Sequence, residues 1–359
     1  MAENPQSTTR IDNTHTPLEG PSRPVKSGSY HSLSRIMLKL FDNIVFFGVW
    51  MWVLLNYPKQ YRHYLKVSRK NNRIPYPVIP RCANDKFLWR KLFDHDPRFV
   101  TISDKLAVKD WVNEEGIDVN TARVLWSGED ADQIPEELLQ QNVVIKANHG
   151  WQMNIFIHDG SYNHDQMVKK ANSFLDRTHG IETGEWGYFD IHRKLFVEEM
   201  LVEDWSELIE MKYYTYGKKI ERLVVIYDRF NDMSADIWAP GRDGTLTLTD
   251  ETAAVSSKRP GMPLPPTHHR ATAITREIGS RFDHMRVDLF TDGNEVWLSE
   301  LTVYNLSGFI TVHGLDPDSP LNTSWDLRES WFLTTHQQGW RRMYANALKR
   351  TLSRQTHSP

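Results

Sequence analysis

The feature that most constrains the fold is a predicted β-hairpin near the C-terminal end, MRVDLFTDGNEVWLSELTVYNLSG (residues 285–308). Two short apolar runs flank Asp292 and Gly293, and an Asp-Gly pair between such runs is a strong hairpin signal. Each run nevertheless carries a carboxylate among its strand residues, Asp288 in the first and Glu300 in the second. Because burying an unpaired carboxylate costs free energy, both side chains need neighbours that neutralise them.

The length of the hairpin loop decides where these carboxylates point, because side chains alternate between the two faces of a strand. A two- or four-residue turn would place Asp288 and Glu300 on opposite faces. We predict a three-residue loop, residues 292–294, which pairs Thr291 with Glu295 and brings both carboxylates onto one face. On that register the polar face holds Arg286, Asp288, Leu298, Glu300 and Thr302, and the core face holds Val287, Leu289, Trp297, Leu301 and Val303.

A polar row on a half-buried sheet has two interpretations. In the first, the side chains are simply solvated. In the second, Asp288 and Glu300 share a hard cation, because adjacent carboxylates on rigid strands suit Mg²⁺, which also binds substrate phosphates. Arg286, which stands beside them on the same strand face, would then face an anion.

The composition limits the class of protein. At 359 residues, with 40% apolar residues and 13 tryptophans, the chain has enough apolar material for one large or two modest globular domains. Its net charge of −3 argues against a nucleic-acid binder held by bulk charge. The single cysteine, Cys82, excludes an internal disulfide and a cysteine-rich zinc site, so we expect a cytoplasmic protein.

The N-terminal region is predicted to contain two segments. Residues 1–30, rich in Ser, Thr, Pro and Asn, are predicted to form a disordered tail that lacks the apolar stretch of a signal peptide. Residues 31–79 are predicted to be helical, because the uncharged run 43–58 is followed by a basic stretch that carries no acid. Either the apolar face of this segment packs onto the folded domain, or residues 31–73 contact the inner face of a membrane peripherally.

From residue 80 onward the pattern alternates between helices and strands. We predict helices over residues 84–93, 103–116, 165–178, 268–282 and 329–352, and strands over residues 142–148, 154–160, 194–202, 209–217 and 219–230. Because the strands pair mostly as hairpins with helices between the groups, the predicted class is α+β. Residues 234–266 are predicted to be a long loop, a mobile flap near a substrate.

Three lysines occupy positions that suit an anion. Lys146 ends an apolar strand, VVIK, where a lysine is uncommon unless its ammonium meets a negative charge. Lys105 is predicted at the start of a helix capped by Ser103, where the helix dipole disfavours a cation. Lys212 lies between Met211 and Tyr213 on another predicted strand. Together with the two carboxylates and Arg286, these lysines predict a nucleotide-triphosphate site.

A nucleotide base also needs a hinge, and FVEEMLVED (residues 196–204) is the candidate. The segment passes from an apolar strand into an acidic loop, so the backbone of Glu199 to Leu201 could meet the edge of the base. An acid just beyond, Glu203 or Asp204, could hold ribose hydroxyls.

Taken in order along the chain, these segments resemble the ATP-grasp superfamily. SDK, VVIK, VEEML, RVD and SELT stand where that superfamily places two phosphate-binding lysines, an adenine hinge and two metal-binding strands. The chain is most similar to the TupA-like branch, named after teichuronopeptide biosynthesis, which carries segments similar to ANDKFLWRKLFDHDPRFVTISDKLAVKDWV, IKANHG, MKYYTYGKK and YDR. The resemblance covers residues 80–320.

The resemblance implies a fold in which two α+β lobes clamp ATP, preceded by the N-terminal helical segment. The ATP-grasp region is expected over residues 80–325, followed by a C-terminal helix and tail over residues 326–359. The implied reaction phosphorylates a substrate carboxylate with ATP, after which an amine attacks the acylphosphate to give an amide.

Each site residue then receives an expected role. Lys105 and Lys146 would bind phosphates with the help of His149 and Gly150, and Mg²⁺ would be bound by Asp288 and Glu300. Arg286 would stabilise charge on the reacting carbonyl, and Lys212 would be a further catalytic residue. Arg229 would hold a substrate carboxylate or pair with Asp228. The expected nucleotide-base and ribose contacts are Glu198, Glu199, Met200, Leu201 and Glu203.

The chain departs from the superfamily pattern at two places. Many ATP-grasp enzymes cover the phosphates with a loop of several glycines, whereas ANHGWQMN offers only Gly150. Many also place an asparagine two residues after the metal-binding glutamate, where this chain has Thr302. Asn305 or water could replace that asparagine, so the number of metal ions stays open.

Three functions follow from these patterns. The first is an ATP- and Mg²⁺-dependent carboxylate–amine ligase that acts on a cell-surface polysaccharide or peptide-polymer precursor, an inference that rests on family analogy. The second is an ATP-dependent phosphotransferase that stops at phosphoryl transfer. The third is a nucleotide-binding protein without turnover in a membrane-associated assembly. The sequence names neither the carboxylate nor the amine, and the oligomeric state stays open.

Overall fold

The computed structural model describes residues 27–69, 73–310 and 318–355. The chain divides into two compact units, residues 1–43 and residues 44–359, and both sheets belong to the second. Helix α1 (Ser27–Asn56) begins before the predicted end of the disordered tail, so residues 27–30 are helical. The rest of that predicted tail, residues 1–26, lies outside the described residues.

Helices α1 and α2 (Pro58–Arg69) form the N-terminal helical segment. In the second unit, α1 packs one face into the core through Phe46, Val49 and Val53. These residues follow a three- to four-residue spacing, which places them on one side of a helix. Pro58 suits the first position of α2 because its missing N–H would be unpaired there in any case.

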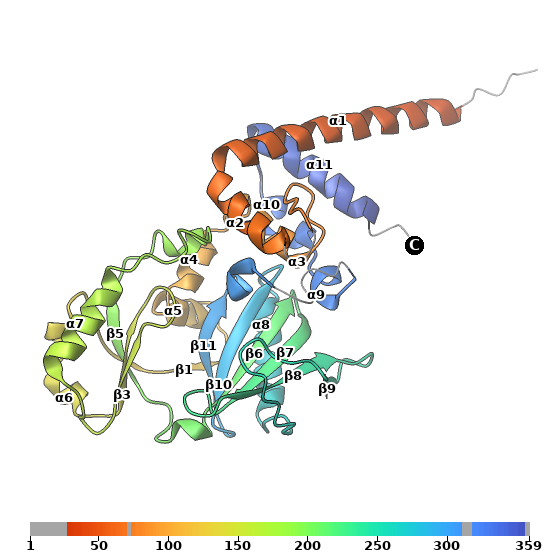
Figure 1. Ribbon diagram of the computed structural model, residues 1–359. Coiled ribbons are helices and arrows are strands. Elements are labelled where there is room, and N and C mark those ends of the chain that lie inside the picture. Colours follow the sequence, from red (N-terminus) through yellow and green to blue (C-terminus); the bar gives the residue numbers. More distant parts are fainter. Residues whose placement is uncertain (1–26, 70–72, 311–317, 356–359) are drawn as a thin grey trace, which may run out of the picture. The chain divides into compact units, whose positions relative to one another are not determined.

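The larger sheet has seven strands (Figure 1). In spatial order they are β1 (Asn120–Thr121), β11 (Val296–Thr302), β10 (Met285–Thr291), β6 (Ile209–Tyr216), β7 (Lys219–Tyr227), β8 (Ser234–Pro240) and β9 (Leu246–Leu248). Neighbouring strands are antiparallel except for β1 and β11. Strands β6 and β7 turn at Gly217 and Lys218, as the sequence predicted.

Strands β8 and β9 correct one prediction. Residues 234–266 were expected to be a loop, but the first half of this segment extends the seven-stranded sheet beyond β7. Because its backbone pairs with β7, this half is part of the framework and not a flap. Residues 252–255 of the second half line a cavity that is described below.

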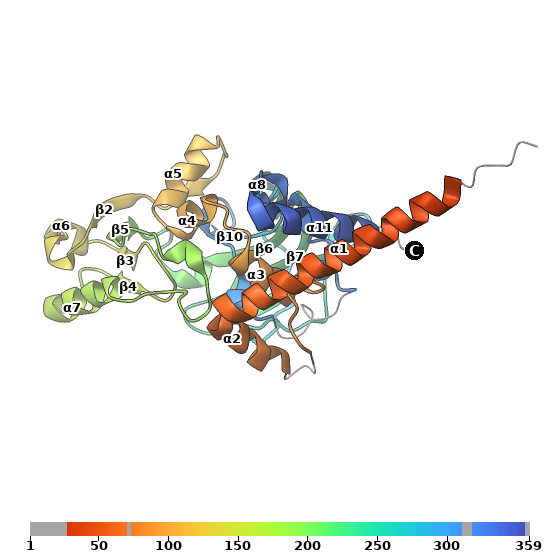
Figure 2. The ribbon, with the colours of Figure 1, turned by 90° about the horizontal axis from the view of Figure 1, so that it is seen from above.

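The smaller sheet has four antiparallel strands, in the order β2 (Val124–Gly128), β5 (Leu195–Glu199), β3 (Val143–Ala147) and β4 (Asn154–Ile157). Its core also contains residues of α7 (His164–Leu175), while α6 (Glu136–Leu139) precedes β3. The two sheets and their helices form two separate groups in both views of the ribbon (Figure 1 and Figure 2). The predicted α+β class is confirmed.

The remaining α-helices contribute residues to the same hydrophobic core as the larger sheet. They are α3 (Ala83–Leu92), α4 (Arg98–Ser103), α5 (Ala107–Glu114), α8 (His268–Gly279), α9 (Pro320–Thr323), α10 (Trp331–Thr334) and α11 (Gly339–Gln355). Helix α8 packs on β6, β7 and β10. The predicted C-terminal helix over 329–352 is in fact two helices, α10 and α11, and Gly339 at the start of α11 has a positive φ of 54°.

The region around Lys105 also differs from the prediction. Ser103 ends α4 and does not cap the next helix. The carboxylate of Asp104 does so, by accepting the backbone N–H groups of Leu106 and Ala107 at 2.8 and 3.2 Å. Lys105 therefore lies in the tight connection between two helices, one residue after the capping side chain.

In the hairpin of β10 and β11, two errors in the predicted register compensate for each other, one in the loop length and one in an unforeseen bulge. Thr291 pairs with Val296, so the loop has four residues instead of three, and this alone would put Asp288 and Glu300 on opposite faces. A β-bulge beside Leu289 shifts the register, and Asp288 lies directly opposite Glu300. The longer loop, which sets the register before the bulge, moves Leu298 from the predicted polar face into the core, and Trp297 to the opposite face.

Candidate active site

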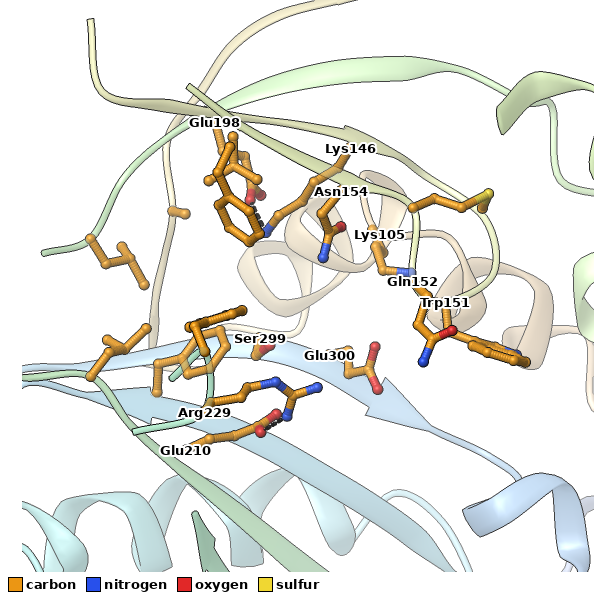
Figure 3. Close-up of a pocket in the computed structure, with 18 of the residues that line it drawn as sticks. Lys105, Lys146, Trp151, Gln152, Asn154, Glu198, Glu210, Arg229, Ser299 and Glu300 are labelled. Atoms are coloured by element: carbon orange, nitrogen blue, oxygen red, sulfur yellow. Dashed lines mark hydrogen bonds and ion pairs between the residues drawn. The ribbon is translucent and has the colours of Figure 1, made fainter. Parts of the chain in front are cut away.

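A cavity of about 430 Å³ lies between the two sheets (Figure 3). The smaller sheet contributes residues of β3, β4 and β5, and the larger sheet contributes residues of β6, β10 and β11. Figure 3 shows Glu198, Lys146, Asn154 and Lys105 on one wall and Glu210, Arg229 and Glu300 on the other. Charged groups from distant parts of the chain thus face one space.

Strand alternation decides which residues of the smaller sheet reach this cavity. Val144 pairs with Glu198 and Lys146 pairs with Phe196, so these four side chains share the face that lines it. The opposite face packs in the core with α7 through Val143, Ile145, Ala147, Leu195 and Val197. The lysine at the end of the apolar run VVIK therefore points away from the core.

Lys146 has a negative partner, as predicted for a lysine on a buried strand. Its Nζ lies 2.5 Å from Oε2 of Glu198, while Nζ of Lys109 lies 2.7 Å from Oε1 of the same carboxylate. Burial alone would raise the pKa of Glu198, but the two ammonium groups outweigh it, so the pKa is lowered. Because two lysines share one carboxylate, the pair leaves a net positive charge beside the cavity.

Lys105 lies next to the single glycine of the expected phosphate loop. Its ammonium donates to the backbone carbonyl of Gly150, and both residues line the cavity. Among the described residues, Lys105 has no carboxylate within ion-pair distance, and burial lowers its pKa although Glu300 opposes this. Asn148 fixes the position of Lys105: the backbone N–H of Lys105 donates to the carbonyl of Asn148 at 2.8 Å, and Asn148 Nδ2 donates to Asp104 at 2.9 Å. An ammonium held in this way suits a bound anion.

His149 does not take the predicted place at the phosphates. Its side chain is buried and is not part of the cavity wall, which is formed here by Gly150, Trp151 and Gln152. Nε2 of His149 donates to the carbonyl of Arg177 at 3.0 Å, which fixes the proton on that nitrogen. Gly150 has φ 70°, and a Cβ there would collide with the His179 ring. The loop thus presents backbone and Gln152, not an imidazole, to the cavity.

The burial of the His149 imidazole predicts that the stability of the protein depends on pH. Burial lowers the pKa of His149 from its ordinary 6.5 to about 4, so its contribution to stability is present above about pH 6.5 and is lost as the pH falls through 4. The His149→Gln variant should lose less stability than the wild type over this interval, because it cannot be protonated there. Urea unfolding midpoints measured between these pH values test it; parallel curves for the two proteins would contradict the buried neutral imidazole.

The predicted base-binding segment is only partly at the cavity. Glu198, Glu199 and Leu201 line it, although Glu199 is also held by Arg123 at 3.1 Å. The backbone N–H of Met200 reaches the carbonyl of Asn142 at 3.4 Å, so it is not free for a base.

The predicted ribose-binding acids do not reach the cavity. Glu203 is exposed and does not line it. Asp204 caps the short helix η3 (Trp205–Glu207) by accepting the N–H of Ser206 at 2.8 Å. The acids that do line the cavity on the larger sheet are Glu210 and Glu300.

Aromatic side chains supply an apolar part of the lining. The rings of Phe156, Trp205 and Phe230 contact one another with centroids 4.8 to 5.2 Å apart. Leu201 and Phe196 line the same cavity. A planar heterocycle can bury its faces against such side chains. The lining therefore combines an apolar, aromatic part with a cationic part.

The larger sheet presents a row of three charged side chains. Glu300, Asp288 and Lys212 are register partners across β11, β10 and β6. Both oxygens of Asp288 accept hydrogen bonds from Arg286 at 2.6 Å, and Oδ2 also contacts Lys212 Nζ at 2.7 Å. Burial alone would raise the pKa of Asp288, but Arg286 and Lys212 lower it to about 2. Asp288 is therefore an ionised, fully buried anchor for two cations.

Glu300 is the carboxylate of this row that stays accessible, with 36% of its side chain exposed. It lies 3.3 Å from Arg286 and accepts a hydrogen bond from Thr302 at 3.1 Å. Thr302 in turn accepts one from Arg286 at 2.9 Å. Arg229 pairs with Glu210 and not with Asp228, while Glu210 also contacts Lys212 at 2.6 Å.

These residues do not form an open divalent-cation site as predicted. Asp288 has no free oxygen, because Arg286 and Lys212 occupy both. Asn305 is directed elsewhere: its Nδ2 lies 2.9 Å from Nε2 of His284. Within residues 27–69, 73–310 and 318–355, no three His, Cys, Asp or Glu side chains converge as metal ligands. The sequence predicted both carboxylates and Arg286 on one face, but it did not predict that Arg286 and Lys212 would engage both oxygens of Asp288.

A second cavity of about 570 Å³ adjoins the first and shares Lys212, Arg229 and Glu300 with it. Its lining adds the guanidinium groups of Arg222, which pairs with Glu251 of the same lining, and of Arg286. The apolar part of its wall comes from Val224, Ile237, Ala253, Ala254, Val255, Leu306, Ile310 and Leu321. A molecule with an anionic group and an apolar or uncharged body fits this lining.

Sequence reasoning missed several site residues. Lys109 lies four residues after Lys105, and Glu210 lies two residues before Lys212 on the same strand, so helical and strand periodicity could have indicated both. Asn148 gave no such signal, because its role depends on contacts with Asp104 and with the carbonyl of His192.

The chain is similar to one protein family and to several solved structures. A family model described as TupA-like ATPgrasp matches residues 85–322. No curated protein gives a significant match. Among solved structures, D-alanine–D-alanine ligase from Bacillus anthracis is 16% identical, with 70% of this chain and 67% of that chain covered and a TM-score of 0.33. Phosphoribosylamine–glycine ligase from Thermotoga maritima is 12% identical, with 63% and 55% covered and a TM-score of 0.38.

This chain spans only part of the solved structures that it matches: 67% of the Bacillus anthracis ligase and 55% of the Thermotoga maritima ligase. The family model, in contrast, covers well over half of this chain and includes β1 to β11. It also includes the expected phosphate lysines, Asp288 and Glu300. The chain therefore belongs to the TupA-like ATP-grasp family, as the order of its motifs predicted.

Proposed function

We propose that this protein is an ATP-dependent carboxylate–amine ligase that forms an amide through an acylphosphate, on a cell-surface polysaccharide or peptide-polymer precursor. The observation that carries the proposal is the pair of adjoining cavities with a shared border of Lys212, Arg229 and Glu300. One cavity suits a nucleotide and the other suits an anionic acceptor, so the reacting groups would meet at that border. Family membership supports the ligase class.

The first cavity is proposed to bind ATP. Lys105 and Lys146 would contact the phosphates, with the backbone at Gly150, because these are cationic or N–H groups that line the cavity. Leu201, with the aromatic group of Phe156, Trp205 and Phe230, would contact the base. ATP would arrive as its magnesium complex, a substrate whose metal would approach the accessible carboxylate of Glu300.

The second cavity is proposed to hold the acceptor carboxylate. Its oxygen would attack the γ-phosphorus of ATP, the bond to the β-phosphate oxygen would break, and ADP would leave. The amine nitrogen would then attack the acyl carbon, release inorganic phosphate and lose one proton. Arg229 and Arg286, which both line this cavity, would neutralise negative charge on the reacting carboxylate and phosphoryl oxygens.

Two other outcomes remain as second candidates. Binding of ATP without turnover is favoured by one observation: Asp288 is fully engaged by Arg286 and Lys212, which leaves Glu300 as the accessible member of the carboxylate pair. A phosphotransferase would use the same two cavities and stop once the acceptor carries the phosphoryl group.

Trapping with hydroxylamine separates these functions. The full chain is incubated with ATP, Mg²⁺, hydroxylamine and a panel of amino acids, uronic acids and short acidic peptides. A ligase gives ADP and a hydroxamate in equal amounts, because hydroxylamine attacks the acylphosphate. ADP with a phosphorylated acceptor and no hydroxamate would identify a phosphotransferase. If the protein binds ATP but releases no ADP in the presence of any acceptor of the panel, ligase activity is contradicted.

A further inference from the structure

The second half of α1 is apolar on two opposite faces. Phe46, Val49 and Val53 are buried in the core. On the other side, Ile44, Phe47, Met51 and Leu55 are 69%, 65%, 40% and 76% exposed. Their spacing of three or four residues makes one continuous stripe along the helix. We define residues 44, 47, 51 and 55 as the apolar stripe.

Helix α2 follows the apolar stripe in the sequence and carries a row of basic side chains. Tyr57 alone separates the two helices. Lys59, Arg62, Lys66 and Arg69 are all exposed and follow the same helical spacing, while Tyr64 and Ser68 on the opposite side are buried. None of the four cations has an ion-pair partner among the described residues. We define these four cations as the basic face.

We infer that residues 44–69 bind the surface of an anionic lipid bilayer, with the apolar stripe in the acyl region and the basic face at the headgroups. Aliphatic and aromatic side chains gain free energy on leaving water, and lysine and arginine gain from anionic lipids. A soluble protein partner would also cover apolar residues, but a run of unpaired cations that follows them directly in the sequence matches the charge of a lipid surface.

Helix packing decides that α1 lies along the bilayer instead of crossing it. By length and composition, Ser34–Asn56 is the one helix in the described part of the chain that could span a membrane. However, its second half packs on protein: the rings of Phe46 and Tyr344 are 6.3 Å apart, and those of Trp52 and Trp340 are 4.8 Å apart. One face thus stays on the domain, and only the other is available to lipid.

Co-sedimentation of the full chain with vesicles tests this inference. One vesicle type contains phosphatidylcholine alone, and the other contains phosphatidylcholine and phosphatidylglycerol in equal parts. The wild type should sediment mainly with the anionic vesicles, and added salt should weaken binding. The pair Lys59→Glu with Arg62→Glu should lower the partition coefficient by at least about tenfold. The pair Phe47→Gln with Leu55→Gln should lower it by a similar factor, about tenfold or more.

Matched controls change the same properties elsewhere. Lys169→Glu with Lys170→Glu alters two exposed lysines of α7, and Ile181→Gln alters an apolar residue that is 57% exposed. Both should bind vesicles like the wild type. Because the basic-face variant changes only exposed side chains, it keeps the test valid even if the apolar-stripe variant unfolds.

Two results would overturn the inference. One is a wild type that stays in the supernatant with both vesicle types, or variants of the stripe and the basic face that bind as the wild type does. The other is a lipid-free dimer in analytical ultracentrifugation that Phe47→Gln with Leu55→Gln dissociates, since this would assign the stripe to a second copy of the chain.

Discussion

Replacing Lys146 with methionine should lower kcat/KM for ATP by about 100-fold or more, a typical cost of removing one preorganised charge at a reacting phosphate or oxyanion. Lys146 lines the proposed nucleotide cavity and is one of the two lysines that pair with the carboxylate of Glu198. Methionine keeps the apolar stem and removes the ammonium. The measurement is the steady-state rate of ADP release with the acceptor found by hydroxylamine trapping.

Lys109→Met is the matched control, because Lys109 holds the same carboxylate at 2.7 Å but is not among the lining residues. Each single variant leaves Glu198 with one lysine, so the fold should tolerate both equally. Lys109→Met should change kcat/KM far less than Lys146→Met. Equal losses in the two variants would mean that Glu198, and not a phosphate contact of Lys146, determines the effect.

Replacing Asp288 with asparagine should destabilise the protein by about 3–5 kcal/mol, because it leaves the buried cations Arg286 and Lys212 without their shared anion. The Asp288 side chain has no exposed surface, so water cannot take over this role. The measurement is the free energy of unfolding in urea at pH 7. Glu300→Gln should cost less than about 1 kcal/mol, since Glu300 is 36% exposed and more weakly held.

The pH dependence of Asp288 has a defined sign. Its folded-state pKa is lowered to about 2 from an ordinary 3.8, so its stabilising contribution is present above about pH 4 and is lost as the pH falls through 2. Asp288→Asn should remove this part of the acid sensitivity. If instead Asp288→Asn is as stable as Glu300→Gln at neutral pH, the buried cation pair is not what holds this sheet together.

The sequence predicted a site residue best where the pattern along a single strand was enough to identify it. Lys146 was recognised as a charge at the end of the apolar run of β3, whereas Glu198, its ion-pair partner on β5, was expected only from the family resemblance, as a base contact. The carboxylate pair of β10 and β11 was placed on one face by a wrong loop length and an unforeseen bulge that compensated for each other. Register is a property of both strands and their neighbours, so turn residues alone could not decide it.

Predictions failed where a side chain had a competing local partner. Asp204 caps η3, and Asn305 turns toward His284 after the strand ends, although the sequence offered the first as a ribose contact and the second as a metal ligand. His149 lies in the loop that was expected to bind phosphate, yet its side chain points to the carbonyl of Arg177. Sequence spacing shows which residues are near the site, but hydrogen-bond partners from distant segments decide which of them reach it.

The central claim is that the cavity between the two sheets holds ATP, and a crystal structure of the full chain with a non-hydrolysable ATP analogue and Mg²⁺ tests it most directly. The predicted result places the phosphates within hydrogen-bond distance of Lys105 and Lys146, the base against Leu201 and Phe230, and the metal beside Glu300. An analogue bound outside this cavity, or a cavity that stays empty at saturating analogue, would contradict the account.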